Sequence, residues 1–125
     1  KASKILKYSG ANTPLFYFSQ DGELNIIKGD RHSIGYKKSD SNYEFNDYSI
    51  NVSEGMQFYL STDGYFDQNG GEKDFPFGKK KFSNILKENF EKTLEEQKIV
   101  LKEKLSIYQN NSERNDDITV IGFKI

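Results

Sequence analysis

The sequence contains no cysteine and no tryptophan, and it has only two prolines, one methionine and one histidine. Without cysteine, the chain has no disulfide framework, no thiolate nucleophile and no cysteine-ligated zinc site. No apolar run approaches the roughly 20 residues that a membrane-spanning helix needs, and no secretory signal stands at the start. We therefore expect a cytoplasmic location and no membrane contact within this segment.

An excess of basic residues is also missing. The chain has 18 Lys and Arg against 19 Asp and Glu, which gives a formal net charge of −1. A nucleic-acid partner would require a basic balance or a basic stripe, so this class is disfavoured. The 125 residues suffice for one domain or part of one, with a lean core because only 34% are hydrophobic. Ten Phe and eight Tyr are expected to supply much of its buried surface.

Strand and turn signals dominate the first half of the chain. Asp21-Gly22 lies between two apolar runs, and this is a strong local signal for a β-hairpin because glycine accepts a positive φ. The polar stretch 37–42 is expected to form a loop. Short apolar runs bounded by turn residues predict strands over residues 5–9, 15–19, 24–27, 48–52 and 56–61.

The second half changes to a helical period and ends in a strand. One apolar face is formed by Phe82, Ile85, Leu86 and Phe90, and a second by Leu94, Leu101, Leu105 and Tyr108. Thr93 and Glu96 are spaced as a capping box at the start of the second helix. The β-branched run 118–121 predicts a final strand. The order of elements predicts an α+β fold, with a mostly antiparallel sheet and a helix pair packed on one face.

Acidic residues stand at two ends of the predicted strands. Asp63 follows the apolar run 58–60, and Asp116 and Asp117 directly precede the final β-branched run. Carboxylates that converge from two strand ends suit hard divalent cations, which prefer oxygen ligands. A two-metal hydrolytic site would need several such carboxylates. The residues alone leave two interpretations open: part of a metal site, or an ordinary Asp-Gly turn and a solvated acidic loop.

Five blocks of the sequence carry a family resemblance. They are YSGANTPLFYF, IKGDRHSIGY, FYLSTDGYFDQNG, FGKKKF and RNDDITVIGFKI. In this order and spacing the blocks resemble the bacterial SpoIIE-type branch of the PPM (PP2C-like) serine/threonine phosphatases. The resemblance implies an α-β-β-α sandwich and hydrolysis of phosphoserine or phosphothreonine with two Mn²⁺ or Mg²⁺ ions. It also implies a metal-activated water as nucleophile, without a covalent phosphoenzyme.

The resemblance implies roles for three acidic residues. The Asp of the S/T-D-G block is a metal ligand in the family, and this role carries over to Asp63. The Asp of the last block carries over to Asp116. Asp117 is expected to contribute less to metal binding than Asp116, because the alternation of side chains along a strand should turn its side chain to the opposite side. As a substrate, the resemblance implies a phosphorylated signalling protein such as an anti-sigma factor antagonist.

The sequence departs from the family pattern in one respect. An Asp followed shortly by Gly-His-Gly supplies the ligand that bridges the two metals in the family, and no such block is present. Residues 1–125 therefore resemble the C-terminal portion of the domain, with the first strands and first acidic motif missing. We expect this segment alone to be inactive and the intact protein to be the enzyme. The alternative is a non-catalytic pseudophosphatase that acts as a signalling module.

Three further features allow more than one interpretation. His32 is either a residue of a surface turn or a substrate contact. The run Lys79-Lys80-Lys81 is either the solvated start of a helix or a surface that attracts a phosphorylated partner. An exposed sheet edge left by the missing strands would offer a route to a homodimer.

Overall fold

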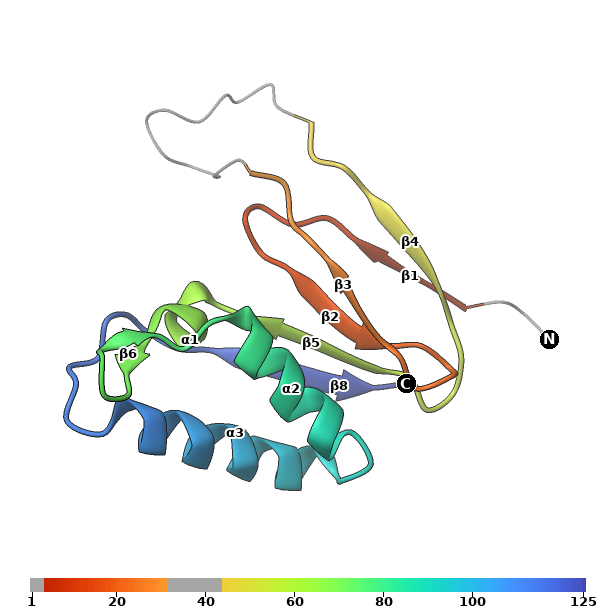
Figure 1. Cartoon of the computed structure of the whole chain (residues 1–125). Coiled ribbons are helices and arrows are strands. Elements are labelled where there is room, and N and C mark those ends of the chain that lie inside the picture. The colour runs from red at the N-terminus through yellow and green to blue at the C-terminus, as the bar shows by residue number, and fades with distance from the viewer. Residues whose placement is uncertain (1–3, 32–43) are drawn as a thin grey trace. The chain divides into compact units, whose positions relative to one another are not determined.

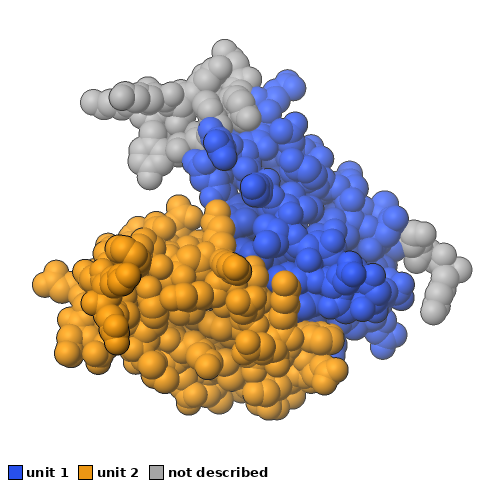
Figure 2. All heavy atoms as spheres, in the orientation of Figure 1, with its two compact units in different colours: residues 1–60, 123–125 blue, residues 61–122 orange. Residues whose placement is uncertain are grey.

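The computed structural model describes residues 4–31 and 44–125, and it divides into two compact units (Figure 1). Unit 1 comprises residues 1–60 and 123–125, and unit 2 comprises residues 61–122 (Figure 2). The predicted loop 37–42 and His32 lie outside the described residues. Each unit is presented by itself below.

Unit 1 is built from strands. β1 pairs antiparallel with β4, whereas the other four strands form a sheet in the order β3-β2-β5-β8. All six strands had been predicted. The ends of the first five lie within one residue of the predicted ones, whereas the last strand, β8, runs over Val120–Lys124 rather than over 118–121. The strands are β1 (Lys4–Tyr8), β2 (Leu15–Phe18), β3 (Leu24–Ile27), β4 (Tyr48–Val52), β5 (Gln57–Ser61) and β8 (Val120–Lys124), the last of which is shared with unit 2.

The predicted hairpin connects β2 and β3. The two strands pair antiparallel, with Leu15 opposite Ile27 and Phe18 opposite Leu24. The connection closes through a hydrogen bond of 2.9 Å from the Ser19 amide to the Glu23 carbonyl oxygen. Gly22 adopts a φ of 82° in this connection, a conformation that a residue with a Cβ rarely takes. The Asp-Gly signal therefore identified the hairpin correctly.

The core of unit 1 lies between its two sheets. It contains Leu15 and Phe58 from the larger sheet, Ile50 from β4, and Met56 from the turn before β5. Phe58 is fully buried, and its ring stacks on Tyr17 at 5.7 Å and on Phe123 at 5.2 Å between ring centroids. Period-two alternation places these side chains on the inner faces of the sheets.

Unit 2 contains the helices and two very short strands. The helix α1 had not been predicted, because Asp63-Gly64 suggested a simple turn; the turn is instead the first turn of this helix. β6 and β7 form a two-stranded antiparallel sheet. The elements are α1 (Asp63–Asp67), β6 (Asn69–Gly70), β7 (Phe75–Pro76), α2 (Lys79–Asn89) and α3 (Leu94–Gln109).

The two predicted helices are confirmed, with one change at an end. α2 ends at Asn89, so Phe90 is its C-cap and only half-buried, whereas Phe82, Ile85 and Leu86 are buried as expected. At the start of α3 the Thr93 hydroxyl accepts a hydrogen bond of 3.2 Å from the Glu96 amide. This is the cap that the Thr93–Glu96 spacing predicted.

An aromatic cluster forms the core of unit 2. Tyr65 packs edge to face on Phe77 and Phe82, and Phe66 packs in the same way on Phe82. The Tyr65 hydroxyl donates a hydrogen bond of 2.7 Å to the Leu101 carbonyl oxygen. The small helix α1 is thus anchored to α3 by one buried polar contact.

The fold is α+β, as predicted, with antiparallel sheets and a pair of helices, α2 and α3, that contact each other. Within the described ranges 4–31 and 44–125, no helix combines the length and the apolar character needed to cross a membrane.

Candidate functional site

The candidate site begins where β5 passes into α1, at Thr62. Thr62 is the N-cap residue of α1, but its side chain makes no capping hydrogen bond. Its hydroxyl instead accepts a hydrogen bond of 2.9 Å from the Thr119 amide and lies 3.3 Å from the Asp117 carbonyl oxygen, to which it donates. The Thr62 amide also donates to the Thr119 carbonyl oxygen at 2.9 Å. These bonds fix the segment before β8 against the start of α1.

Gly64 allows the two segments to approach closely. A Cβ at this position would lie 2.2 Å from the Asp117 carbonyl oxygen, a distance that real Cβ atoms essentially never show. Gly64 is buried although its neighbours Thr62 and Asp63 are exposed. The glycine of the S-T-D-G block therefore serves close packing of backbone on backbone, which brings Asp117 beside the first turn of α1.

A second set of polar contacts lies at the other end of α1. The Gln68 side-chain amide donates a hydrogen bond of 2.9 Å to the Glu113 carbonyl oxygen, and its side-chain oxygen accepts from the Asn115 amide at 3.4 Å. The Asn69 amide donates to the Asn115 side-chain oxygen at 3.3 Å. Gln68 is fully buried. Residues 62–69 and 113–119 are therefore held side by side along their length.

This arrangement brings Asp63 and the Asp116-Asp117 pair to the same end of two adjoining segments. Asp63 is the first residue of α1, where a negative charge interacts favourably with the helix dipole. All three aspartates are exposed. One side-chain oxygen of Asp116 accepts a hydrogen bond of 2.7 Å from the Asp117 amide, which orients this carboxylate.

Strand alternation was the argument for ranking Asp117 below Asp116 as a metal ligand, and this argument is wrong. Asp117 precedes β8, which starts at Val120, so strand alternation does not govern the direction of its side chain. What the structure assigns to Asp117 is a backbone role, because its carbonyl oxygen packs against Gly64 and accepts from Thr62. Sequence analysis missed the roles of Thr62, Gln68 and Asn115, although the first of them lies next to Asp63.

The donor atoms at this end suit a hard divalent cation. Exposed carboxylate oxygens are the ligands that Mn²⁺ and Mg²⁺ prefer, and Asp63 and Asp116 present them from backbone that is fixed on both sides. Over the described part of the chain, however, no three His, Cys, Asp or Glu side chains gather closely enough to hold a metal ion. The chain thus offers oxygen atoms of suitable chemistry at this end, and the metal role of Asp63 and Asp116 stays a prediction.

The interior beneath this end remains uncharged. Burial raises the pKa of the Tyr65 hydroxyl well above its ordinary value, so the group stays protonated at neutral pH. The residue lies two positions after Asp63, and its hydroxyl donates to the Leu101 carbonyl oxygen. Tyr65 therefore adds no charge beside Asp63.

The fold is α+β with antiparallel sheets, and the three aspartates lie on two adjoining segments. The family model of stage II sporulation protein E (SpoIIE) matches residues 1–125. The chain belongs to the SpoIIE family, as the five sequence blocks had indicated.

A solved structure agrees with this assignment. The chain is 34% identical to the SiaA-PP2C domain of Pseudomonas aeruginosa, with a TM-score of 0.84. The match covers 97% of this chain and 46% of the other chain, so the present chain spans about half the length of its structural relative. The predicted PP2C-like fold is thereby confirmed. A comparison with curated protein sequences gives no match.

Proposed function

We propose that, in the intact protein, this chain supplies part of the active site of a metal-dependent phosphoprotein phosphatase. Asp63 and Asp116 are the proposed metal ligands, and Asp117 contributes a smaller share. The observation that carries the proposal is the close approach of Gly64 to the Asp117 carbonyl oxygen, which joins the two acidic segments. Membership of the SpoIIE family supports the reaction class.

In this proposal the protein positions charge rather than forming a covalent intermediate. Mn²⁺ or Mg²⁺ at such a site supplies a nucleophilic water near neutral pH and offsets the charge of the phosphoryl oxygens. Asp63 and Asp116 orient the cations through their carboxylates. Thr62 and Gly64 keep the two ligand segments in register, through the bonds to residues 117 and 119. A fixed ligand shell matters because metal geometry is lost when supporting contacts are loose.

Residues 1–125 are proposed to form the C-terminal portion of the phosphatase domain. A bridging carboxylate, which the family takes from an Asp/Gly-His-Gly block, would then come from elsewhere in the intact protein. The absence of a three-ligand cluster in the described part of the chain is compatible with this division. We expect residues 1–125 alone to bind Mn²⁺ weakly and to lack phosphatase activity, and a form that includes the bridging block to have both.

The proposed substrate is a phosphoserine or phosphothreonine protein of a bacterial signalling system, such as an anti-sigma factor antagonist in the cytoplasm. This part of the proposal follows the family resemblance. The alternative is a pseudophosphatase that keeps the fold and binds a partner without catalysis. The enzyme and the pseudophosphatase differ in whether the intact protein contains the bridging Asp/Gly-His-Gly block.

A homodimer through an unpaired sheet edge is proposed for residues 1–125, and sedimentation over a concentration series tests it.

The substitution Asp63→Asn in the full-length protein tests the metal assignment. The amide keeps the shape of the side chain but loses its charge, so Mn²⁺-dependent hydrolysis of p-nitrophenyl phosphate should fall by at least about 100-fold. The matched control is Asp67→Asn, an exposed aspartate at the other end of the same helix, which should retain activity. Asp116→Asn should cost more activity than Asp117→Asn. Near wild-type turnover in Asp63→Asn, with unchanged Mn²⁺ demand, would refute the assignment.

A further inference from the structure

Three consecutive lysines occupy the first turn of α2. Lys79, Lys80 and Lys81 are all exposed, and this turn contains no acidic residue. Cations at a helix N-terminus oppose the helix dipole, so the sequence places positive charge where it does not favour the helix. The charge therefore calls for an explanation other than the stability of α2.

Two of the three lysines pack over aromatic rings. The Lys81 ammonium lies 4.1 Å from the centre of the Tyr108 ring and 5.6 Å from that of Phe77. The Lys79 ammonium lies 5.7 Å from the centre of the Phe66 ring. These are cation–π distances, which hold the two ammonium groups near defined positions. The Tyr108 ring is itself fixed, because its hydroxyl donates to the Phe75 carbonyl oxygen at 2.7 Å.

None of the three lysines forms an ion pair with an acidic residue in the described part of the chain. The nearest acidic residues in sequence are Asp74, Glu72 and Glu88, and the Asp74 carboxylate accepts a hydrogen bond of 2.6 Å from the Ser112 hydroxyl. Across the described residues, the single ion pair is Lys98–Glu95, which lies on α3. Lys80 carries no such pair and no aromatic contact within that part of the chain, so its ammonium is available to a partner.

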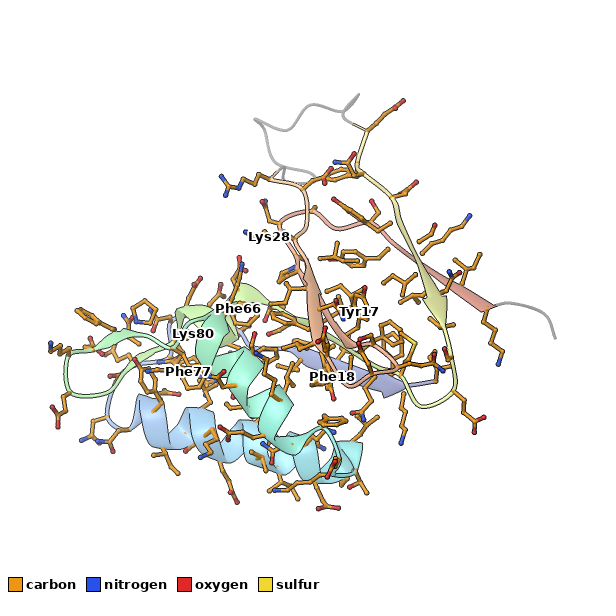
Figure 3. All side chains as sticks on the ribbon, turned by 45° about the vertical axis from the view of Figure 1, so that its right-hand side comes forward. Tyr17, Phe18, Lys28, Phe66, Phe77 and Lys80 are labelled. Atoms are coloured by element: carbon orange, nitrogen blue, oxygen red, sulfur yellow. The ribbon has the colours of Figure 1, made fainter. Side chains whose placement is uncertain are left out.

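This lysine patch is joined directly to the candidate site. The Gly78 amide donates to the Phe66 carbonyl oxygen at 2.8 Å, and the Phe77 amide donates to the Gln68 carbonyl oxygen at 2.9 Å. The start of α2 is thus bonded to the end of α1, the helix that Asp63 begins. α1 has five residues and is therefore about 7 Å long. Figure 3 labels Phe66, Phe77 and Lys80 around this junction. An extended peptide lying along α1 would cover this length in about two residues.

We propose that Lys79, Lys80 and Lys81 form a docking surface for an acidic segment of the substrate protein, a few residues from its phosphorylated side chain. The inference rests on the proposed phosphatase function and specifies which substrates it takes. Ammonium groups are point charges without the planar fork of arginine, so they select for negative charge rather than for one sequence. Such a surface raises the rate and strength of association with acidic substrates.

The experiment compares three substrates with the full-length protein and Mn²⁺. One is a phosphoserine peptide with four Asp or Glu beside the phosphoserine. The second is the same peptide with Asn and Gln in their place, and the third is p-nitrophenyl phosphate. The test variant is Lys80→Glu, since Lys80 is exposed and has neither an ion pair nor a cation–π contact among the described residues. The matched control is Lys104→Glu, an equal charge reversal at an exposed position of α3.

For Lys80→Glu we expect kcat/KM on the acidic peptide to fall about fivefold or more, mainly through KM. The other two substrates should be unaffected, and Lys104→Glu should resemble wild type on all three. At about 1 M salt, where the screening length is about 3 Å, the difference on the acidic peptide should vanish. Equal kcat/KM for wild type and Lys80→Glu on the acidic peptide, or an equal loss on all three substrates, would overturn the docking surface.

Binding separates this inference from the proposed function. Fluorescence anisotropy of the labelled acidic peptide should show weaker binding to Lys80→Glu than to Lys104→Glu. If the wild-type protein hydrolyses none of the three substrates but retains this difference in binding, the phosphatase function fails while the docking surface stands. If it hydrolyses p-nitrophenyl phosphate and shows no difference in binding, the docking surface fails while the function stands.

Discussion

The aromatic contacts inside unit 1 differ in geometry from those inside unit 2. In unit 1 Phe58 stacks nearly parallel on Tyr17 and on Phe123, at interplanar angles of 21° and 14°, and Phe18 meets Tyr59 edge to face at 84°. In unit 2 the rings meet edge to face, as Tyr65 and Phe82 do at 70°. Unit 1 thus combines stacked and edge-to-face pairs, whereas the aromatic pairs around Tyr65 and Phe82 in unit 2 are edge to face.

The two units also differ in the sequence separation between the partners of their side-chain hydrogen bonds. Those of unit 1 mostly join near neighbours in sequence, such as Ser19 with Asp21 and Glu23. Those of unit 2 include many that join residues far apart, such as Thr62 with Thr119 and Gln68 with Glu113. Long-range hydrogen bonds fix irregular segments that no periodic pattern would place. The unit that carries the candidate site is therefore the one whose geometry depends on single polar side chains.

The largest expected effect tests the hydrophobic side of this comparison. Phe58→Ala removes a fully buried ring with stacking partners on both sides, and should lower the free energy of unfolding by about 3–5 kcal/mol. The control is Phe75→Ala in unit 2, whose ring is 61% exposed and should contribute less than about 1 kcal/mol. Urea denaturation of the full-length protein measures both. Similar losses for the two variants would mean that burial does not distinguish these positions.

A smaller effect tests the close backbone packing in unit 2. Gly64→Ala should favour the helix α1 by about 1 kcal/mol on propensity alone. The new Cβ would nevertheless lie 2.2 Å from the Asp117 carbonyl oxygen, so overpacking should win and destabilise by about 1–3 kcal/mol. Separation of the segments should speed hydrogen exchange of the Thr119 amide, which bonds the Thr62 hydroxyl. Asp67→Ala at the exposed end of α1 is the control, and should leave that exchange unchanged. A Gly64→Ala protein with slow Thr119 exchange would show that the contact is not restrictive.

Sequence patterns predicted the regular parts of both units well. The hairpin at Asp21-Gly22, the strand 48–52 and the cap at Thr93 follow from short-range chemistry that the chain carries locally. The pairing of β1 with β4 lies beyond such patterns, because about 40 residues separate the two strands. β6 and β7, with two residues each, are too short to show a period.

The acidic residues of the candidate site were named from the sequence, and their role as metal ligands stays a prediction. The residues that hold them in place were not predicted. Asp63 and Asp116 followed from the motif blocks, whereas α1 was missed because an Asp-Gly pair usually marks a turn. The bond between the Thr62 hydroxyl and the Thr119 amide depends on how two distant segments meet. Turns and helix caps depend on residues that are close in sequence, so a sequence pattern predicts them. Contacts between loops that are distant in sequence have no such pattern. The sites most in need of structure are those assembled from such loops.

The smallest expected effect lies in the hairpin of unit 1, where the contacts are local. The Ser19 hydroxyl donates to the Asp21 carboxylate, and this bond, followed by one from the Glu23 amide, holds the pKa of Asp21 below its ordinary value. A lowered carboxyl pKa adds stability above the unfolded-state value of about 3.9, and the gain is lost as the pH falls through the lower folded-state value. Ser19→Ala should raise the pKa of Asp21, measured by an NMR titration of its carboxyl carbon.

The stability difference between wild type and Ser19→Ala should accordingly be present at neutral pH and disappear in acid, below the folded-state pKa of Asp21. Ser49→Ala, at an exposed position of β4, is the control and should leave the titration of Asp21 unchanged. Because Asp21 is fully exposed, water and salt screen the interaction, and the effect on unfolding should be close to the limit of measurement. If the pKa of Asp21 is unchanged in Ser19→Ala, the Ser19 hydroxyl does not lower it. The lowered pKa would then be due to the hydrogen bond from the Glu23 amide, which this substitution leaves in place.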